Sequence, residues 1–301
     1  MSDRIICGWR VRSDLPLPET APWTGPDRAV DIEIRAAAIP AHIGERNAEL
    51  PYLEIASDGR LLIDAGPVAR FLVTPNRIIV DTPLDPDAPD WRACLLGPVL
   101  AIVCYLRGTL PLHASALRMG DRAFAIAGRS GAGKSTLAAA LARRGYVFVT
   151  DDICACTGFP RQPLVQPSYP AIKLTAASLD ALGIDGRGLS PIGPDFEKVQ
   201  LPQPAGYDPS PLPLDAVYLI EDAEDDSEDR IIHTDGVEGF QRVTAEIYRP
   251  PIGRLLLAKP RFFAMATQLA TGVSIRRLVR RRDLRQLAAL VEAIESDLIR
   301  A

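Results

Sequence analysis

The sequence lacks the composition of several protein classes. It balances 34 Lys and Arg against 38 Asp and Glu, and this net charge of -4 gives no overall basic surface for nucleic acid. Its cysteines are odd in number and contain no C-x-x-C pair, which argues against a disulfide framework or a zinc ribbon. We therefore expect no nucleic-acid partner and reduced, mostly buried thiols at Cys7, Cys94, Cys104, Cys154 and Cys156.

Long apolar runs are also missing. The longest uncharged apolar stretch, residues 93–106, contains Gly97 and Pro98 and is shorter than the roughly 20 residues that a membrane-spanning helix requires. Residues 1–14 carry charges where a signal peptide needs an apolar stretch. With 47% apolar and 24% charged residues, the composition is that of an ordinary globular protein. We expect a cytoplasmic protein without a membrane span.

The pattern of the chain changes near residue 92. Before that point, short strand-like segments at 5–11, 30–35, 61–63, 70–73 and 77–80 are separated by Pro, Gly and Asp. They predict a small β-rich N-terminal domain over residues 1–92. After it, helical and strand-like segments alternate, which predicts an α/β domain with a mixed sheet over residues 93–301.

Within the second part, several elements are predicted from periodicity and turn residues. We expect a helix over 91–106, strands over 112–117, 123–127 and 146–149, and a helix over 133–144 that ends before Gly145. Residues 216–220 and 230–233 are expected to pair as a hairpin around an acidic segment, 221–229. Helices over 237–248 and 254–271, a strand over 273–278 and a last helix from Asp283 follow.

The most specific motif lies between the 123–127 strand and the 133–144 helix. It matches G-x-x-x-x-G-K-[ST] in full, with the residues Gly128, Arg129, Ser130, Gly131, Ala132, Gly133, Lys134 and Ser135, and Thr136 follows. In this motif backbone amides and the helix N-terminus bind phosphates. Lys134 would reach the β- and γ-phosphates of ATP, and the Ser135 hydroxyl would bind Mg²⁺. The alternative is a glycine-rich turn without a ligand.

Two carboxylates and one histidine could complete a reaction centre. Asp151 and Asp152 follow the 146–149 strand, and one helix and one strand separate them from Lys134, a spacing that would return them to the phosphates. One carboxylate could hold Mg²⁺ and the other could accept a proton from an attacking hydroxyl. The alternative is a solvated turn or a helix cap. His113 precedes the motif and could take part, although a lone histidine is more often structural than catalytic.

Residues 113–152, HASALRMGDRAFAIAGRSGAGKSTLAAALARRGYVFVTDD, resemble the catalytic core of the HPr kinase/phosphorylase family. His113, the phosphate-binding motif and the Asp151-Asp152 pair are spaced as in that family. The resemblance implies a P-loop kinase fold, and it implies Asp151 as the general base, assisted by His113, with Asp152 and Ser135 at the metal. It also implies an oligomer, although no interface can be identified in the sequence.

Two features of the sequence indicate which group within this family it resembles. Thr136 stands where the HPr-modifying enzymes carry a metal-binding Glu, which argues against reversible action on HPr. The whole chain is more similar to the shorter HPr-kinase-like group found near lasso-peptide biosynthetic genes, in stretches such as WRVRSDLPLPE and LLGPVL…LPLHAS. This likeness implies an ATP-dependent serine kinase acting on a peptide or protein, in some members on the C-terminal serine of the precursor.

Other readings of the motif remain open at this point. A nucleotide-hydrolysing switch, a non-catalytic nucleotide-binding scaffold and an HPr serine kinase use the same phosphate-binding loop. No N-K-x-D motif is present, which favours ATP over a strict GTP requirement. Lys173 or Lys198 could meet the transferring phosphate. The arginines in residues 276–285 could bind nucleic acid or an acidic peptide; the alternative, which the sequence favours, is that they are solvated or paired with the acidic segment.

Overall fold

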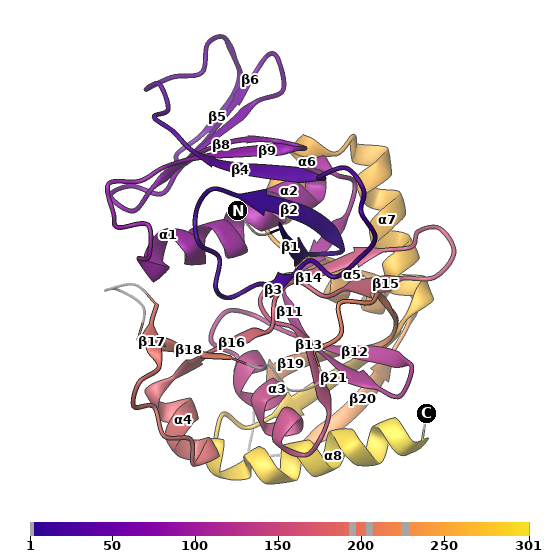
Figure 1. The fold of residues 1–301 in the computed structure, drawn as a ribbon. Helices are drawn as coiled ribbons and strands as arrows, with labels where there is room; N and C mark the ends of the chain where they lie inside the picture. The colour runs from indigo at the N-terminus through magenta and orange to yellow at the C-terminus, as the bar shows by residue number, and fades with distance from the viewer. Residues whose placement is uncertain (1–2, 193–196, 203–206, 224–228, 301) are drawn as a thin grey trace.

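The computed structural model describes residues 3–192, 197–202, 207–223 and 229–300. The fold is mixed α/β, with a nine-stranded sheet from the N-terminal part, a second large mixed sheet that carries the phosphate-binding loop, and a small sheet of three strands. Figure 1 shows the N-terminal sheet at one end of the molecule and the C-terminal helix at the other, with the phosphate-binding loop's helix, α3 (Lys134–Arg143), between them.

The N-terminal sheet has the strand order β3-β1-β2-β4-β9-β8-β7-β6-β5. The predicted strand over 5–11 is two strands, because Cys7 and Gly8 adopt φ of 51° and 75° and form a tight turn between them. The strands are β1 Asp3–Ile6, β2 Trp9–Ser13, β3 Ala21–Pro22, β4 Ile32–Ala36, β5 Arg46–Leu50, β6 Leu53–Ala56, β7 Leu61–Asp64, β8 Arg70–Thr74 and β9 Arg77–Asp81.

A long helical segment connects this sheet to the rest of the chain. It consists of α1 (Pro89–Cys94), a π-helical turn η1 (Leu95–Val99) and α2 (Leu100–Leu106). Pro98 lies inside the π-helical turn, where the missing N–H interrupts regular α-helical bonding. By length and composition the segment could cross a membrane, but 67% of it is buried inside the protein. Its apolar side chains therefore belong to the core.

The second large sheet holds the phosphate-binding loop at the end of β12 (Arg122–Ala127). Strand β12 pairs with β11 (Ala114–Met119) on one side and in parallel with β19 (Leu212–Asp222) on the other. The predicted strand over 112–117 is split at His113, which separates β11 from β10. The remaining strands of this sheet are β10 Leu110–Leu112, β13 Val147–Thr150, β14 Cys154–Thr157, β15 Leu164–Gln166, β20 Arg230–Thr234 and β21 Ser274–Arg280.

The predicted hairpin between 216–220 and 230–233 is wrong. Strand β21 lies between β19 and β20, parallel to the first and antiparallel to the second. The physical reason is burial: β21 presents Ile275, Leu278 and Val279 to the interior and needs a neighbour on each side, whereas β20 is mostly half-buried or exposed and occupies the edge. Residues 224–228 of the acidic segment lie outside the described residues.

The helices after β20 differ from the prediction in one place. The predicted helix over 254–271 is two helices, because Leu257 and Ala258 are extended and Pro260 begins a new helix. A small sheet with the strand order β16-β18-β17 lies beside α3 and α4. The elements whose bounds have not yet been given are β16 Ala171–Thr175, α4 Ala176–Leu182, β17 Ser190–Pro191, β18 Lys198–Pro202, α5 Gly236–Ala245, α6 Pro250–Leu256, α7 Lys259–Gly272, η2 Leu284–Gln286 and α8 Leu287–Arg300.

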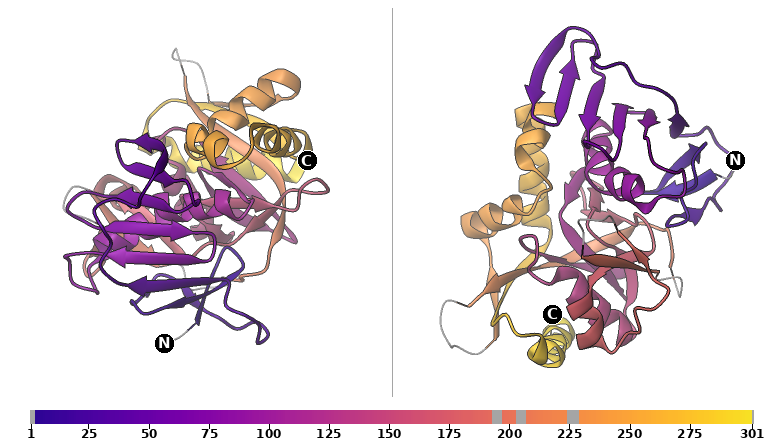
Figure 2. Two further views of the ribbon diagram at one scale, coloured as in Figure 1. Left: turned by 90° about the horizontal axis from the view of Figure 1, so that it is seen from above. Right: turned by 90° about the vertical axis from the view of Figure 1, so that its left-hand side faces the viewer.

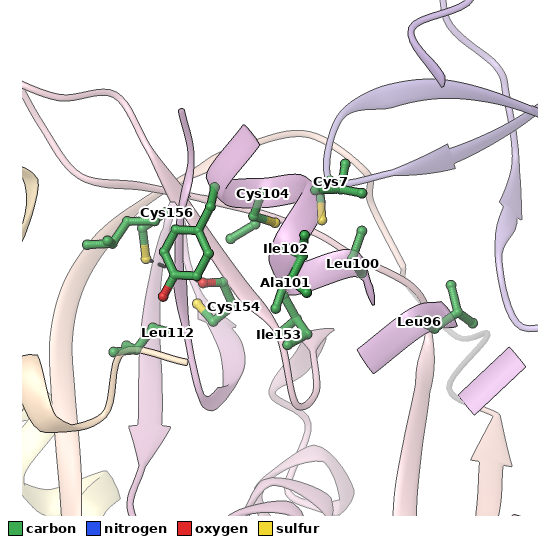
Figure 3. Packing of buried hydrophobic residues seen from close by; sticks show 14 of the residues in the cluster. Cys7, Leu96, Leu100, Ala101, Ile102, Cys104, Leu112, Ile153, Cys154 and Cys156 are labelled. Carbon is green, nitrogen blue, oxygen red and sulfur yellow. Dashed lines mark hydrogen bonds between the residues drawn. The ribbon is translucent and has the colours of Figure 1, made fainter. Parts of the chain in front are cut away.

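One apolar core joins the N-terminal sheet to the second sheet. Ile34 and Phe71 of the N-terminal strands belong to the same buried cluster as residues of α2, β10 and β14. Figure 3 shows Cys7 next to Cys104 of α2, and Cys104 lies between Cys7 and the pair Cys154 and Cys156 of β14. All five cysteines are free, and four of them are buried, as expected. Figure 2 shows α7 along the side of the molecule, where its apolar face closes this core.

Candidate active site

The phosphate-binding loop connects β12 to α3. Gly128, Gly131 and Gly133 adopt φ of 149°, 77° and 89°, the backbone region that favours glycine. A Cβ on Gly128 would lie 3.1 Å from the carbonyl oxygen of Ile220 in β19. A larger residue at the first position would therefore be strained and would crowd β19, and the N-terminus of the ten-residue helix α3 faces the same space.

Lys134 is held inside this loop. Its side-chain nitrogen donates to the carbonyl oxygen of Gly128 at 2.7 Å and to that of Arg129 at 3.3 Å. The residue is only 7% exposed, and burial lowers the pKa of its ammonium group, although Asp152 and Glu246 oppose the shift. A phosphate in the loop would supply the negative charge that these neutral carbonyls do not.

Asp151 lies against Ser135. Its carboxylate accepts from the Ser115 hydroxyl at 2.6 Å and from the Ser135 hydroxyl at 3.0 Å, and it also accepts from the backbone N–H of Lys173 at 3.2 Å. The residue is 2% exposed. These contacts leave Asp151 fixed beside the hydroxyl that the motif assigns to Mg²⁺.

Asp152 faces a different set of partners. The His113 Nε2 atom lies 3.2 Å from one carboxylate oxygen of Asp152, and the Lys173 side-chain nitrogen lies 3.5 Å from the other. Burial raises the pKa of Asp152, but Lys173, His113 and Lys134 outweigh it and hold the pKa well below its usual range. Asp152 adopts φ of 68°, a conformation that costs energy in a residue other than glycine and is often found at functional sites.

The two carboxylates thus have different neighbours from those that the family resemblance implies. The resemblance assigns His113 to Asp151 and Ser135 to Asp152, whereas the observed contacts join His113 to Asp152 and Ser135 to Asp151. Spacing along the chain could not separate two adjacent residues. The left-handed backbone of Asp152 separates them here, because it turns the second carboxylate toward His113.

The two lysines singled out in the sequence both line the same cavity. Lys173 is already paired with Asp152, and the electrostatic influence of Tyr169 and the two aspartates outweighs burial and raises its pKa. Lys198 of β18 lies across from Thr175 in the small sheet. Lys173 is therefore positioned to orient Asp152, and Lys198 is the freer cation of the two.

Two arginines contact the phosphate-binding loop, and the sequence did not predict these contacts. Arg280 is the last residue of β21, and Arg282 follows it by two residues. Arg280 donates to the carbonyl oxygen of Ala132 at 2.6 Å, and Arg282 donates to that of Gly131 at 3.1 Å. Arg280 also lies 3.5 Å from Asp222, so the arginine run is in part paired with the acidic segment, as one interpretation predicted. The sequence contained the arginines but gave no sign that β21 would end beside the phosphate-binding loop.

Most of the residues described above line one cavity of about 690 Å³; they are His113, Lys134, Ser135, Asp151, Asp152, Lys173, Lys198, Arg280 and Arg282. Six cationic side chains line it, against three aspartates, in a protein whose net charge is negative; the cations are Lys134, Lys173, Lys198, Arg249, Arg280 and Arg282. In this lining Asp152 contacts His113, and the ring of His113 in turn contacts that of Tyr248. Leucines of η2 and α8 also belong to the lining. A cavity with this charge is suited to an anionic ligand.

The cavity lining includes one further strained residue. Arg249 adopts φ of 46°, and its guanidinium carbon lies 4.7 Å from the ring centre of Tyr52 and 5.9 Å from that of Tyr248. Tyr52 comes from the N-terminal sheet, between β5 and β6. The N-terminal part of the chain therefore reaches a residue of the cavity lining.

The donor groups suit a nucleotide-bound Mg²⁺ ion. Among the described residues, no group of three or more His, Cys, Asp or Glu side chains is arranged to hold a metal. Mg²⁺ with a nucleotide needs only one or two protein ligands besides phosphate oxygens and water. The Ser135 hydroxyl and the Asp151 carboxylate, at 3.0 Å from each other, are oxygen donors of that kind.

Comparison with known proteins gives limited help. No protein-family model matches the sequence, and no curated protein matches it. Among solved structures, the Hpr(Ser) kinase/phosphatase from Coxiella burnetii is similar with 12% identity and a TM-score of 0.38, over 63% of this chain and 97% of that one. A similarity at this level shows neither the family nor the function of this chain.

Proposed function

We propose that this protein is a phosphotransferase that moves the γ-phosphate of ATP to a serine hydroxyl of a peptide or protein. The observation that carries the proposal is the carboxylate of Asp152, which lies against His113 and Lys173 in the same cavity as the phosphate-binding loop. A P-loop alone binds a nucleotide, whereas a second, separately held carboxylate beside it can orient a hydroxyl.

The residues then take the following roles. Lys134 and the loop amides bind the β- and γ-phosphates of ATP. Ser135 and Asp151 would hold Mg²⁺, which neutralises charge on the phosphates when it is bound. Asp152, rather than Asp151, orients the serine hydroxyl, with His113 and Lys173 fixing its carboxylate.

ATP, the serine hydroxyl and Asp152 account for every bond and proton in the transfer. The bond between the γ-phosphorus and the bridging oxygen of ADP breaks as the bond to the serine oxygen forms, and the serine proton passes to Asp152. The transition state of such a transfer is loose, so the hydroxyl needs positioning more than early deprotonation. A carboxylate with a low pKa is adequate for this role, because it takes up the proton late.

The choice of acceptor rests on the family resemblance and on Arg249. The family resemblance favours the C-terminal serine of a lasso-peptide precursor. Arg249 supports an acceptor that carries a carboxylate close to its hydroxyl, because this exposed guanidinium lines the same cavity as Asp152 and has no acidic partner among the described residues. An internal serine and the protein HPr are the acceptors to compare with it.

Phosphotransfer from labelled ATP with Mg²⁺ tests the proposal. The acceptors are peptides with a C-terminal serine, the same peptides with an internal serine, and HPr, and mass spectrometry locates the phosphate. We expect transfer to serine that disappears in Lys134→Ala. ATP hydrolysis without transfer to any acceptor would favour a nucleotide-hydrolysing switch instead, and binding without turnover would favour a scaffold.

A further inference from the structure

Part of the cavity lining is formed by leucine side chains that follow the arginines after β21. Leu284 of η2 and Leu287 and Leu290 of α8 form it, and we call these three residues the leucine shelf. Leu284 is 44% exposed although it is a large apolar residue, while Leu290 is 5% exposed and packs into the core below. The shelf thus has a fixed base and an apolar upper surface that remains open.

The shelf is continuous with the phosphate-binding loop. Arg282 stands two residues before Leu284 and donates to the carbonyl oxygen of Gly131 at 3.1 Å. Gly131, Arg282 and Leu284 line the same cavity. A ligand held by the loop can therefore extend onto the shelf without leaving the cavity.

The direction of the ligand follows from the position of Asp152. If the γ-phosphate is to reach a hydroxyl oriented by Asp152, it points toward His113, the partner of that carboxylate. The remainder of the nucleotide must then extend from the loop away from His113. The leucine shelf is an apolar part of the same cavity that follows Arg282, a residue in contact with the loop.

The polar groups near the shelf are already bonded. The Thr136 and Ser178 hydroxyls lie 2.8 Å apart and share a hydrogen bond. The Asp283 carboxylate accepts from the backbone and the guanidinium of Arg285, each at 3.0 Å. The open surface is therefore suited to the flat face of an aromatic ring rather than to a polar group.

We infer that the leucine shelf binds the nucleoside of the phosphate donor, with the base lying on Leu284. This inference rests on the proposed function, because it takes the direction of the donor from the role of Asp152. It assigns the 44% exposed Leu284 to ligand binding rather than to folding, since core packing beneath it is provided by Leu290.

Calorimetric binding of two probes with Mg²⁺ separates the shelf from the loop. ATP contacts both, whereas inorganic tripolyphosphate contacts only the loop. We expect Leu284→Ser to weaken ATP about tenfold and to leave tripolyphosphate binding unchanged, with recovery in Leu284→Met. Ile299→Ser is the matched control, because Ile299 is an 85% exposed apolar residue at the far end of α8.

The outcomes distinguish the inference from the proposed function. ATP binding by the wild-type protein that Leu284→Ser leaves unchanged would overturn the inference alone. Equal weakening of both probes would also overturn it, because the substitution would then act through the loop. Failure of the wild-type protein to bind either probe would overturn the proposed function and the inference together.

Discussion

Asp151 and Asp152 are adjacent in the chain but have different neighbours, so substitution of each should change a different step of the reaction. Asp152→Asn removes the carboxylate that faces His113, and we expect the transfer rate to fall about 100- to 10,000-fold, as for loss of a general base, with ATP affinity retained. Asp151→Asn removes the partner of Ser135, and we expect it chiefly to raise the Mg²⁺ concentration needed for ATP binding. Single-turnover transfer and Mg²⁺-dependent ATP binding test both. The reverse pattern would restore the roles implied by the family resemblance.

Arg282 provides a second test at this scale. Its guanidinium contacts the loop at Gly131 and is exposed, so it is free to turn toward a bound phosphate. Because a hydrogen bond to a charged group contributes about 1.5 to 3 kcal/mol, Arg282→Gln should weaken ATP binding by about tenfold or more. Arg285→Gln is the control, since the Arg285 side chain is 90% exposed and is paired with Asp283. Equal affinities of the two variants for ATP would remove Arg282 from the site.

At the scale of elements, a buried ionic cluster fixes α8 to the second sheet. Asp297 of α8 contacts Arg276 of β21, Tyr218 of β19 and His233 of β20, and both Arg276 and Asp297 are buried. Removing one partner of a buried pair costs about 3 to 5 kcal/mol, so Asp297→Asn should lower the free energy of unfolding by that amount at pH 7. Glu295→Gln is the control on the same helix. It pairs with a largely exposed Arg144, and we expect a loss of less than about 1 kcal/mol.

The same cluster predicts a pH dependence. Burial raises the pKa of Asp297, but Tyr218, His233 and Arg276 outweigh it and lower the pKa below its ordinary value of 3.8. A lowered pKa in the folded state stabilises the protein above the unfolded-state pKa, and this stabilisation is lost as the pH falls through the folded-state pKa. The difference between wild type and Asp297→Asn should be present at pH 7 and shrink below about pH 4. Urea unfolding across this range measures it, and a difference that grew on acidification would contradict the cluster's role.

Some elements of the fold could be predicted from the sequence and others could not. The strand, glycine loop and helix around Gly128 and Lys134 were predictable, because each is determined by residues adjacent in the chain. The pairing of β19, β21 and β20 was not, since it depends on contacts between segments separated by three helices. Arg280 and Arg282 were missed for the same reason. Which of two neighbouring aspartates faces His113 depended on one backbone angle, which no spacing rule reveals.

Across the whole molecule, the N-terminal sheet and the cavity of the proposed active site are physically connected. The helical segment of α1, η1 and α2 is buried between the N-terminal sheet and β14, and its first part reaches the cavity. Gly97 of η1 is close enough to Asp152 that a Cβ there would lie 3.4 Å from the carboxylate. Tyr52 contacts Arg249 from the other side. The predicted boundary near residue 92 therefore crosses a continuous core.

This continuity predicts how a shortened chain behaves. Residues 84–301 retain α1 and every residue of the proposed site, but they lose the strands that cover α2, including Phe71 and Val73, which are fully buried. Exposure of that apolar surface should prevent cooperative folding, since burial of apolar area is the main stabilising contribution. Thermal unfolding followed by near-ultraviolet circular dichroism and binding of a hydrophobic dye should show a broad transition and strong dye binding, against a sharp transition in the full chain. A shortened chain that unfolds cooperatively would instead show that residues 84–301 fold without the N-terminal strands, and its ATP affinity and transfer rate would then measure how much of the site depends on Tyr52.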